Sequence, residues 1–282
     1  MPPFDNIRLA TLEDLPRIAT VAAAGFFWSP TFQFQRPHHA SFPEDTLSSY
    51  WRCYLSELQD PAAAVLVAED VGEQDERSHV YDALRHSPMY DTLQDGRARV
   101  VVGVCSIDLK PESWRMGQFS RSSSGRGADH QAHVDPPGHH VLYNTLDRDF
   151  SDEAYAVYNQ MTGPAKKKYL AGKMKLTTLA VHPAYWRRGH ATNLVSWCVR
   201  LADMDGVSVA VSAAPMGARV AVKAGFEEQE VVRIKRSTKE NAAAHLADHD
   251  IGDVELWIAI RRPLQAPSGG SSTSNSPRRR SL

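Results

Sequence analysis

Residues 176–204, LTTLAVHPAYWRRGHATNLVSWCVRLADM, decide the expected fold of this 282-residue chain. The stretch opens with a β-branched apolar run, which predicts a strand that ends at Val181. A short proline-containing turn leads to Gly189, and apolar residues then recur three and four positions apart over residues 191–202. This spacing predicts an amphipathic helix with one apolar stripe, and Gly206 supplies its stop.

A strand that enters a helix through a basic, glycine-containing turn is suited to binding an anion. The first turn of a helix carries backbone N–H groups without partners in the helix, and the helix dipole places positive charge there. Phosphate is the anion most often found at such a site. Gly189 has no Cβ, so the backbone can approach the anion closely.

This segment resembles the acyl-CoA-binding segment of the GNAT superfamily of N-acetyltransferases. Val181-His182-Pro183 matches the family's Val-x-Pro exit from the strand, and Gly189 and Ala191 match the two small positions at the helix start. The family has Gln or Arg three positions before the first small residue, where this chain has Trp186. Taken alone, Arg-Arg-Gly-x-Ala is also typical of an ordinary strand-to-helix turn with two solvated arginines.

The resemblance implies that acetyl-CoA is a cosubstrate. It implies that backbone amides of the turn cradle the pyrophosphate, and that backbone groups of the preceding strand pair with the pantetheine arm. The implied cofactor-binding residues are Leu179, Ala180, Val181, Arg187, Arg188, Gly189, His190, Ala191 and Thr192.

A second segment follows in the order that the family shows. Residues 207–213 predict a short strand, and residues 214–226 predict a short helix that ends in Lys-Ala-Gly-Phe, like the family's Lys-x-Gly-Phe. Together the two segments imply an α/β fold, a GNAT-type mixed and centrally splayed sheet of six to seven strands flanked by helices. The remaining strands are expected at 7–10, 64–68, 99–107, 226–235 and 254–260, and the helices at 15–22, 47–58 and 153–170.

One acetyltransferase domain over residues 5–262 accounts for most of the chain. Residues 111–140 are polar, rich in Ser, Gly and His, and lack periodicity, so we expect a disordered insertion there. The low-complexity tail, residues 263–282, is expected to be disordered for the same reason.

The overall composition is that of an ordinary soluble globular protein. Net charge is −1, hydrophobic residues make up 42% and charged residues 23%. No basic excess points to nucleic acid, and no apolar run approaches a membrane span or a signal peptide. The three cysteines fall inside expected helices or strands, which favours buried free thiols and a cytoplasmic location.

Acetyl transfer by direct attack needs a base for the ammonium proton and an acid for the leaving thiolate. Many family members place a tyrosine four positions before the glycine of the Gly-Phe pair, where this chain has Ala221. Ser212 is a candidate donor in its place, although a serine there more often caps the next helix. The expected strand 173–181 carries no carboxylate, so Asp108, at the end of the preceding strand, is the candidate base. An aspartate in this position more often does no more than end the strand.

The segment between the first two helices usually sets acceptor specificity in this family. Here it is rich in aromatic residues, which predicts a pocket for a small amine with an apolar or aromatic body. The alternative is that the aromatic residues form the segment's own core. No carboxylate lies between Phe26 and Phe42, which argues against a polyamine or histone-tail acceptor. The predicted substrate residues are Phe27, Trp28, Phe32 and Phe34.

Two other functions compete with an acetyltransferase. Ala221 and Trp186 leave open a GNAT-type module that binds acyl-CoA without transferring the acyl group. A metal-dependent enzyme is the other, because His245 and His249 are four positions apart. His133, His139 and His140 cluster in the insertion. The pair lacks the glutamate of the His-Glu-x-x-His pattern, so solvated histidines and no bound metal are expected.

Overall fold

The computed structural model describes residues 6–91, 99–120, 146–235 and 253–264. One mixed sheet of seven strands, in the order β1-β2-β3-β4-β5-β7-β6, forms its centre, which confirms the expected fold class. The strands are β1 (Ile7–Leu9), β2 (Ala63–Asp70), β3 (Val100–Asp108), β4 (Met174–Val181), β5 (Val209–Ala213), β6 (Glu227–Ile234) and β7 (Val254–Arg261).

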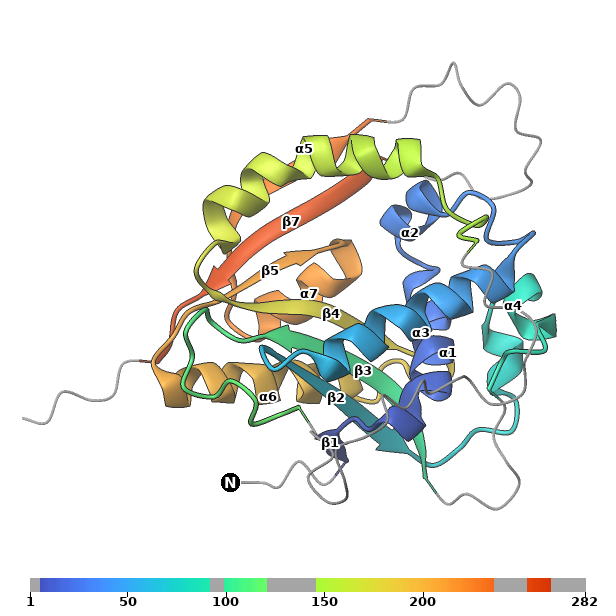
Figure 1. Ribbon diagram of the computed structural model, residues 1–282, viewed down its shortest axis with the longest axis horizontal. Coiled ribbons are helices and arrows are strands. Elements are labelled where there is room, and N and C mark those ends of the chain that lie inside the picture. Colours follow the sequence, from blue (N-terminus) through green and yellow to red (C-terminus); the bar gives the residue numbers. More distant parts are fainter. Residues whose placement is uncertain (1–5, 92–98, 121–145, 236–252, 265–282) are drawn as a thin grey trace, which may run out of the picture.

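The two halves of this sheet are joined by a short parallel seam. All neighbouring strands are antiparallel except β4 and β5, which pair only from Met174–Val209 to Leu176–Val211. Beyond Leu176, β4 stays paired with β3 while β5 turns away with β7 (Figure 1). The β3–β4 register shifts at this point and leaves Thr177 as an extra residue, a bulge that bends β4. The sheet is therefore splayed at its centre, as expected.

Helices cover both faces of the sheet (Figure 1). α6 and α7 pack on one face, and α1 and α3 pack on the opposite face of β2, β3 and β4. α5 crosses β6 and β7 on that opposite face. The helices are α1 (Leu15–Phe26), α2 (Pro30–Gln35), α3 (Pro43–Gln59), α4 (Asp82–His86), α5 (Asp152–Leu170), α6 (His190–Asp205) and α7 (Pro215–Lys223).

The expected stripe of α6 is its buried face. Leu194, Cys198 and Leu201, spaced by four and three residues, are each at most 2% exposed against the sheet. The helix begins at Gly189, with φ 90°, and ends at Gly206, with φ 63°. Both glycines adopt left-handed backbone that side chains disfavour, so these two residues fix where α6 starts and stops.

A buried polar network ties α1 to the chain just beyond β4. Arg17 forms a two-pronged ion pair with Glu76, at 2.6 and 2.7 Å, and both side chains are less than a tenth exposed. Tyr90 and Tyr185 each donate a hydroxyl hydrogen bond to Glu76. His182 joins through Tyr90, at 3.0 Å, and burial lowers the pKa of His182 to about 3, so its ring is neutral. This network thus anchors the segment between β4 and the turn into α6, which contains His182 and Tyr185.

The start of the expected disordered insertion has defined structure. Phe119 packs edge-on against Trp197 of α6, and Arg115 forms an ion pair with Asp205 at 2.7 Å. Residues 111–120 are therefore ordered, because their few apolar and charged side chains find partners that lie far away in the sequence. Residues 121–140 and 265–282 lie outside the described residues.

The five histidines proposed as metal ligands also lie outside the described residues. Cys105 and Cys198 are buried free thiols as expected, whereas Cys53 is exposed on α3. Within the described ranges, no helix has both the length and the apolar character needed to cross a membrane.

Candidate active site

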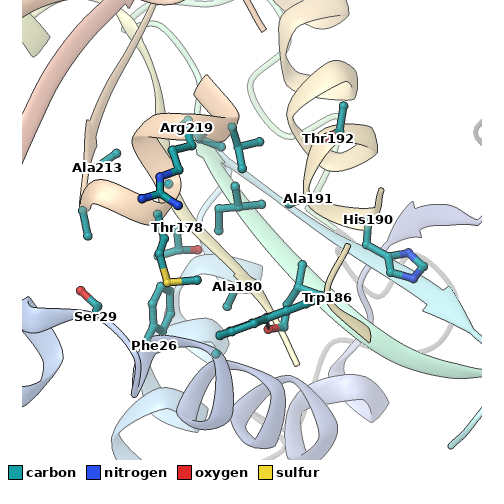
Figure 2. Close-up of a pocket in the computed structure, with 18 of the residues that line it drawn as sticks. Phe26, Ser29, Thr178, Ala180, Trp186, His190, Ala191, Thr192, Ala213 and Arg219 are labelled. Atoms are coloured by element: carbon teal, nitrogen blue, oxygen red, sulfur yellow. Dashed lines mark hydrogen bonds between the residues drawn. The ribbon is translucent and has the colours of Figure 1, made fainter. Parts of the chain in front are cut away.

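A cleft of about 520 Å³ opens where β4 and β5 separate (Figure 2). The last six residues of β4 form one wall, and the end of β5 with the first part of α7 forms the other. The turn into α6 lies at one end of the cleft. The C-terminal end of α1 and the residues after it close the other side, where Phe26 and Ser29 line the cleft.

The turn before α6 has the geometry of an anion site. Arg187 and Gly189 both have left-handed backbone, with φ 63° and 90°. A Cβ built on Gly189 meets no atom within 4 Å, so the space in front of the helix is open. The N–H groups at the start of a 16-residue helix face this space together with the positive end of its dipole. These residues fit a phosphate group.

Eight of the nine expected cofactor-binding residues line the cleft, and Arg188 does not. Its guanidinium donates a 2.7 Å hydrogen bond to Glu73 and lies 3.5 Å from Asp70. Two nearby carboxylates hold this side chain, so the expectation that Arg188 binds the cofactor is corrected. The eight residues are Leu179, Ala180, Val181, Arg187, Gly189, His190, Ala191 and Thr192.

The side chain of His190 is held by residues that do not line the cleft. The imidazole is buried, its Nε2 lies 2.9 Å from an oxygen of Asp70, and Asn6 donates to its Nδ1 at 3.3 Å. Desolvation of Asp70 is outweighed by the Val71 amide and the His190 ring, which hold the pKa of Asp70 below its ordinary value. Both ring nitrogens are therefore engaged away from the phosphate position.

Trp186, the departure from the family pattern, closes the end of β4. Its indole N–H donates a 2.7 Å hydrogen bond to the carbonyl of Val181, and its ring packs edge-on against Trp28 at 6.0 Å. The Val181 carbonyl therefore already has a hydrogen-bond partner within the protein. Figure 2 shows Trp186 among the side chains that face the cleft.

The expected aromatic acceptor pocket is wrong for three of its four residues. Phe27 and Phe32 are 7% and 4% exposed and pack with each other in an aromatic cluster, and Phe34 packs against α5 and β7. These rings form the segment's own core, the alternative considered above. Trp28 is half exposed and reaches the site only by touching Trp186. Local sequence could not distinguish a ring that faces the cleft from one that faces the core.

The two candidate catalytic residues have different outcomes. Asp108 forms an ion pair with Lys175, at 3.2 Å, near the opposite end of β4 and does not line the cleft, so it is corrected as a site residue. Ser212 lines the cleft from β5, and its role as a proton donor stays a prediction. Ala221 is buried on α7 and offers no hydroxyl.

Charge in the cleft is positive. Among the described residues that line it there is no Asp or Glu, whereas Arg187 lies at the phosphate turn and Arg219 projects from α7 (Figure 2). Arg219 has no ion pair or hydrogen bond within the described ranges. Sequence reasoning missed it because an arginine on a short helix is most often solvated.

A polar cluster lies behind β4 on the face covered by α1 and α3. Tyr54 of α3 donates a 3.1 Å hydrogen bond to the hydroxyl of Thr178, which lines the cleft. Ser106 is the cross-strand partner of Thr178, and its buried Oγ has no partner within the described residues. Oε2 of Glu57 is likewise buried without a hydrogen-bond partner within the described residues. Burial raises the pKa of Glu57 to about 7.

Glu57→Gln is expected to stabilise the folded protein at pH 8. A raised carboxyl pKa means that the folded state binds the proton more tightly, so stability falls as pH rises from about 4.5 to about 7. At about 1.4 kcal/mol per pH unit, reduced for partial exposure, the gain at pH 8 is about 1–3 kcal/mol. Denaturant unfolding at pH 5 and pH 8 measures it.

The control for this measurement is Glu227→Gln, which neutralises an exposed carboxylate on β6. It is expected to change stability by less than about 0.5 kcal/mol at either pH. An effect of Glu57→Gln that is equal at both pH values would show that Glu57 does not titrate between them.

In the part of the chain that the structure describes, no group of three or more potential ligands could hold a metal ion.

No protein-family model matches the chain. The chain is 33% identical, over 226 residues, to an acetyltransferase from Stachybotrys chartarum, and the match covers 80% of this chain and 82% of that protein.

Solved acetyltransferases also resemble the structure. Arylalkylamine N-acetyltransferase 2 from Aedes aegypti has a TM-score of 0.47 and 12% identity, with 91% of this chain and 97% of that chain covered. PaiA N-acetyltransferase from Thermoplasma acidophilum in complex with coenzyme A has a TM-score of 0.38 and 12% identity, with the same coverage of both chains.

The fold places a cleft between two splayed strands, beside a glycine turn that opens a helix. With the Stachybotrys relative, it assigns the protein: the chain belongs to the GNAT superfamily of acetyltransferases.

Proposed function

We propose that the protein transfers the acetyl group of acetyl-CoA to the amino group of a small-molecule acceptor, by direct attack in a ternary complex. The observation that carries the proposal is the open turn at Gly189, which faces the end of β4 where that strand has lost its partner. One ligand that bears both a phosphate and a strand-like arm would satisfy both features.

This chain's residues would bind acetyl-CoA along its length. Amides of the turn and the Arg187 side chain would hold the pyrophosphate. The edge of β4 that faces β5 is unpaired beyond Leu176, so its N–H and C=O groups are free to pair with the pantetheine amides. An N–H on the same edge would polarise the thioester carbonyl. When bound, acetyl-CoA supplies the reactive thioester.

The walls of the cleft favour an acceptor with an apolar body. Phe26, Trp186 and Met216 present apolar surface, and burying an aromatic or aliphatic group there contributes roughly 1.5–3 kcal/mol. The two arginines and the absence of a carboxylate among the described lining residues oppose a polycation such as a polyamine. Thus the acceptor is proposed to be a small amine that carries a single positive charge at most.

Ala221 supports a second candidate, a module that binds acetyl-CoA without transferring its acetyl group. The two functions share the cofactor and differ in turnover. A first measurement therefore tests the cofactor, and a second distinguishes an enzyme from a binding module.

Acetyl-CoA is expected to raise the melting temperature by several degrees. A ligand that binds only the folded state adds about 3 kcal/mol at a hundredfold excess over its Kd. Thermal unfolding with millimolar acetyl-CoA, with coenzyme A or with no ligand measures the shift, and no shift would contradict the cofactor assignment. Release of free thiol with a panel of apolar, aromatic and polycationic amines then tests transfer. Release with none of them would favour the binding module.

A further inference from the structure

We propose that Glu57 accepts the proton that the acceptor ammonium must lose, and that the hydroxyls of Thr178 and Ser106 carry this proton from the cleft. The inference deepens the proposed function and rests on it. Glu57 does not line the cleft, so it acts through the two hydroxyls.

The geometry forms a continuous polar path through β4 and β3. Thr178 lines the cleft, and Ser106 lies directly opposite it on the adjacent strand. Side chains of directly opposed residues lie on the same face with β carbons about 4.5–5.5 Å apart, within reach of a hydroxyl contact, direct or through one water. Glu57 lies close enough to Ser106 for that hydroxyl to lower the pKa of the carboxyl.

Tyr54 sets the direction of the path. Burial raises the pKa of Tyr54 well above its ordinary value, so its hydroxyl keeps its proton and donates to Thr178. Oγ1 of Thr178 thus accepts a hydrogen bond from Tyr54, and its own hydroxyl proton is available for donation to Ser106. The Ser106 proton is in turn available for Oε2 of Glu57, and both of these atoms are buried without a partner within the described residues.

The surroundings of Glu57 favour it over Asp108 as the proton acceptor. Asp108 forms an ion pair with Lys175. Glu57 forms no ion pair with a cation within the described residues. Burial, followed by the charges of Asp108 on β3 and Asp60 on α3, raises its pKa to about 7, while Ser106 and Cys53 lower it. A base with a pKa near the working pH is the most effective for proton transfer.

The proposed step balances as follows. The ammonium gives one proton to Oγ of Thr178 as Thr178 passes its own to Ser106 and Ser106 passes its own to the Glu57 carboxylate. The neutral amine nitrogen then forms a bond to the acetyl carbon, and the carbon–sulfur bond breaks. The departing thiolate takes the second proton from the former amine nitrogen. Glu57 is partly exposed, so the carboxylic acid returns its proton to solvent.

The test is the pH profile of turnover for wild type, Glu57→Gln and Ser106→Ala, each as the full chain with the best amine from the panel. We expect the wild-type kcat to fall below an apparent pKa near 7. Glu57→Gln should lower kcat on the order of 100-fold to 10,000-fold and abolish that limb. Ser106→Ala should lower kcat and move the limb to higher pH, because Ser106 lowers the pKa of Glu57.

Controls separate a proton path from a structural role. Acetyl-CoA affinity should match wild type in both variants, and Glu227→Gln, at an exposed carboxylate of β6, should keep the wild-type kcat. If Glu57→Gln keeps wild-type kcat and the same limb, the proposal is wrong although the acetyltransferase function stands. If Glu57→Gln does not fold, an unmoved limb in Ser106→Ala would overturn it. If wild type binds acetyl-CoA but acetylates no amine, the proposed function is wrong, and the proton path that rests on it is wrong with it.

Discussion

Replacing Arg17 by Met is expected to lower the free energy of unfolding by about 3–5 kcal/mol, which is roughly 6–20 °C in melting temperature. The substitution leaves the carboxylate of Glu76 buried, 3% exposed, without its cation. Burial alone would raise the pKa of Glu76, but the paired Arg17, with the hydroxyl of Tyr185, holds that pKa below its ordinary value. Thermal and denaturant unfolding at pH 7 measure the loss.

Arg233→Met is the matched control. Arg233 and Glu255 form an ion pair of nearly the same length, 2.7 Å, but their side chains are 60% and 40% exposed. Loss of this pair should change stability by less than about 1 kcal/mol. Arg17→Met combined with Glu76→Gln should recover much of the lost stability, because no buried charge remains. Equal effects of the two single substitutions would show that burial does not govern the strength of the Arg17 pair.

Gly189→Asp is expected to weaken acetyl-CoA binding by more than about 100-fold, the second large effect. The new carboxylate would occupy the open space in front of α6, where sterics and like charge both oppose a phosphate. Calorimetric titration of acetyl-CoA into wild type and variant measures it.

Gly189→Ala is the control for backbone strain. Both substitutions force a side chain into φ 90°, at a cost of about 1–2 kcal/mol, but only Asp adds charge. Stability should therefore fall equally in the two variants, and affinity should fall much further in Gly189→Asp. Wild-type affinity in Gly189→Asp would mean that the phosphate binds elsewhere.

Elements with a regular apolar pattern could be predicted from sequence. The stripe of α6 and the glycines at its two ends are local signals, since propensity and periodicity act over a few residues. The expected strands overlap all seven observed ones, but β6, with the sequence EEQEVVRI, is mostly polar and was expected from the Gly-Phe motif that precedes it. The splay itself came from resemblance, since three register pairs between β4 and β5 leave no mark on either strand alone.

It was harder to predict which side chains face the cleft, because contacts between residues far apart in the sequence decide the direction of each side chain. Phe26 lines the cleft while its neighbour Phe27 is core, and no local pattern separates them. Glu57 resembles any other polar residue on an amphipathic helix in the sequence. Only its burial in the fold, together with the nearby charge of Asp108, raises its pKa. The expectation for residues 111–120 failed for the same reason, since Phe119 finds Trp197 far along the chain.

The position of β7 has a consequence for how the protein is made. Among the strands of the described residues β7 comes last in sequence, yet it lies between β5 and β6 and joins them. Until residues 254–261 have left the ribosome, β5 has no neighbour on that side and β6 has none at all, so one wall of the cleft lacks its support. A nascent chain can therefore assemble β1 to β4 early, but it gains a complete cleft only after residues 254–261 have emerged.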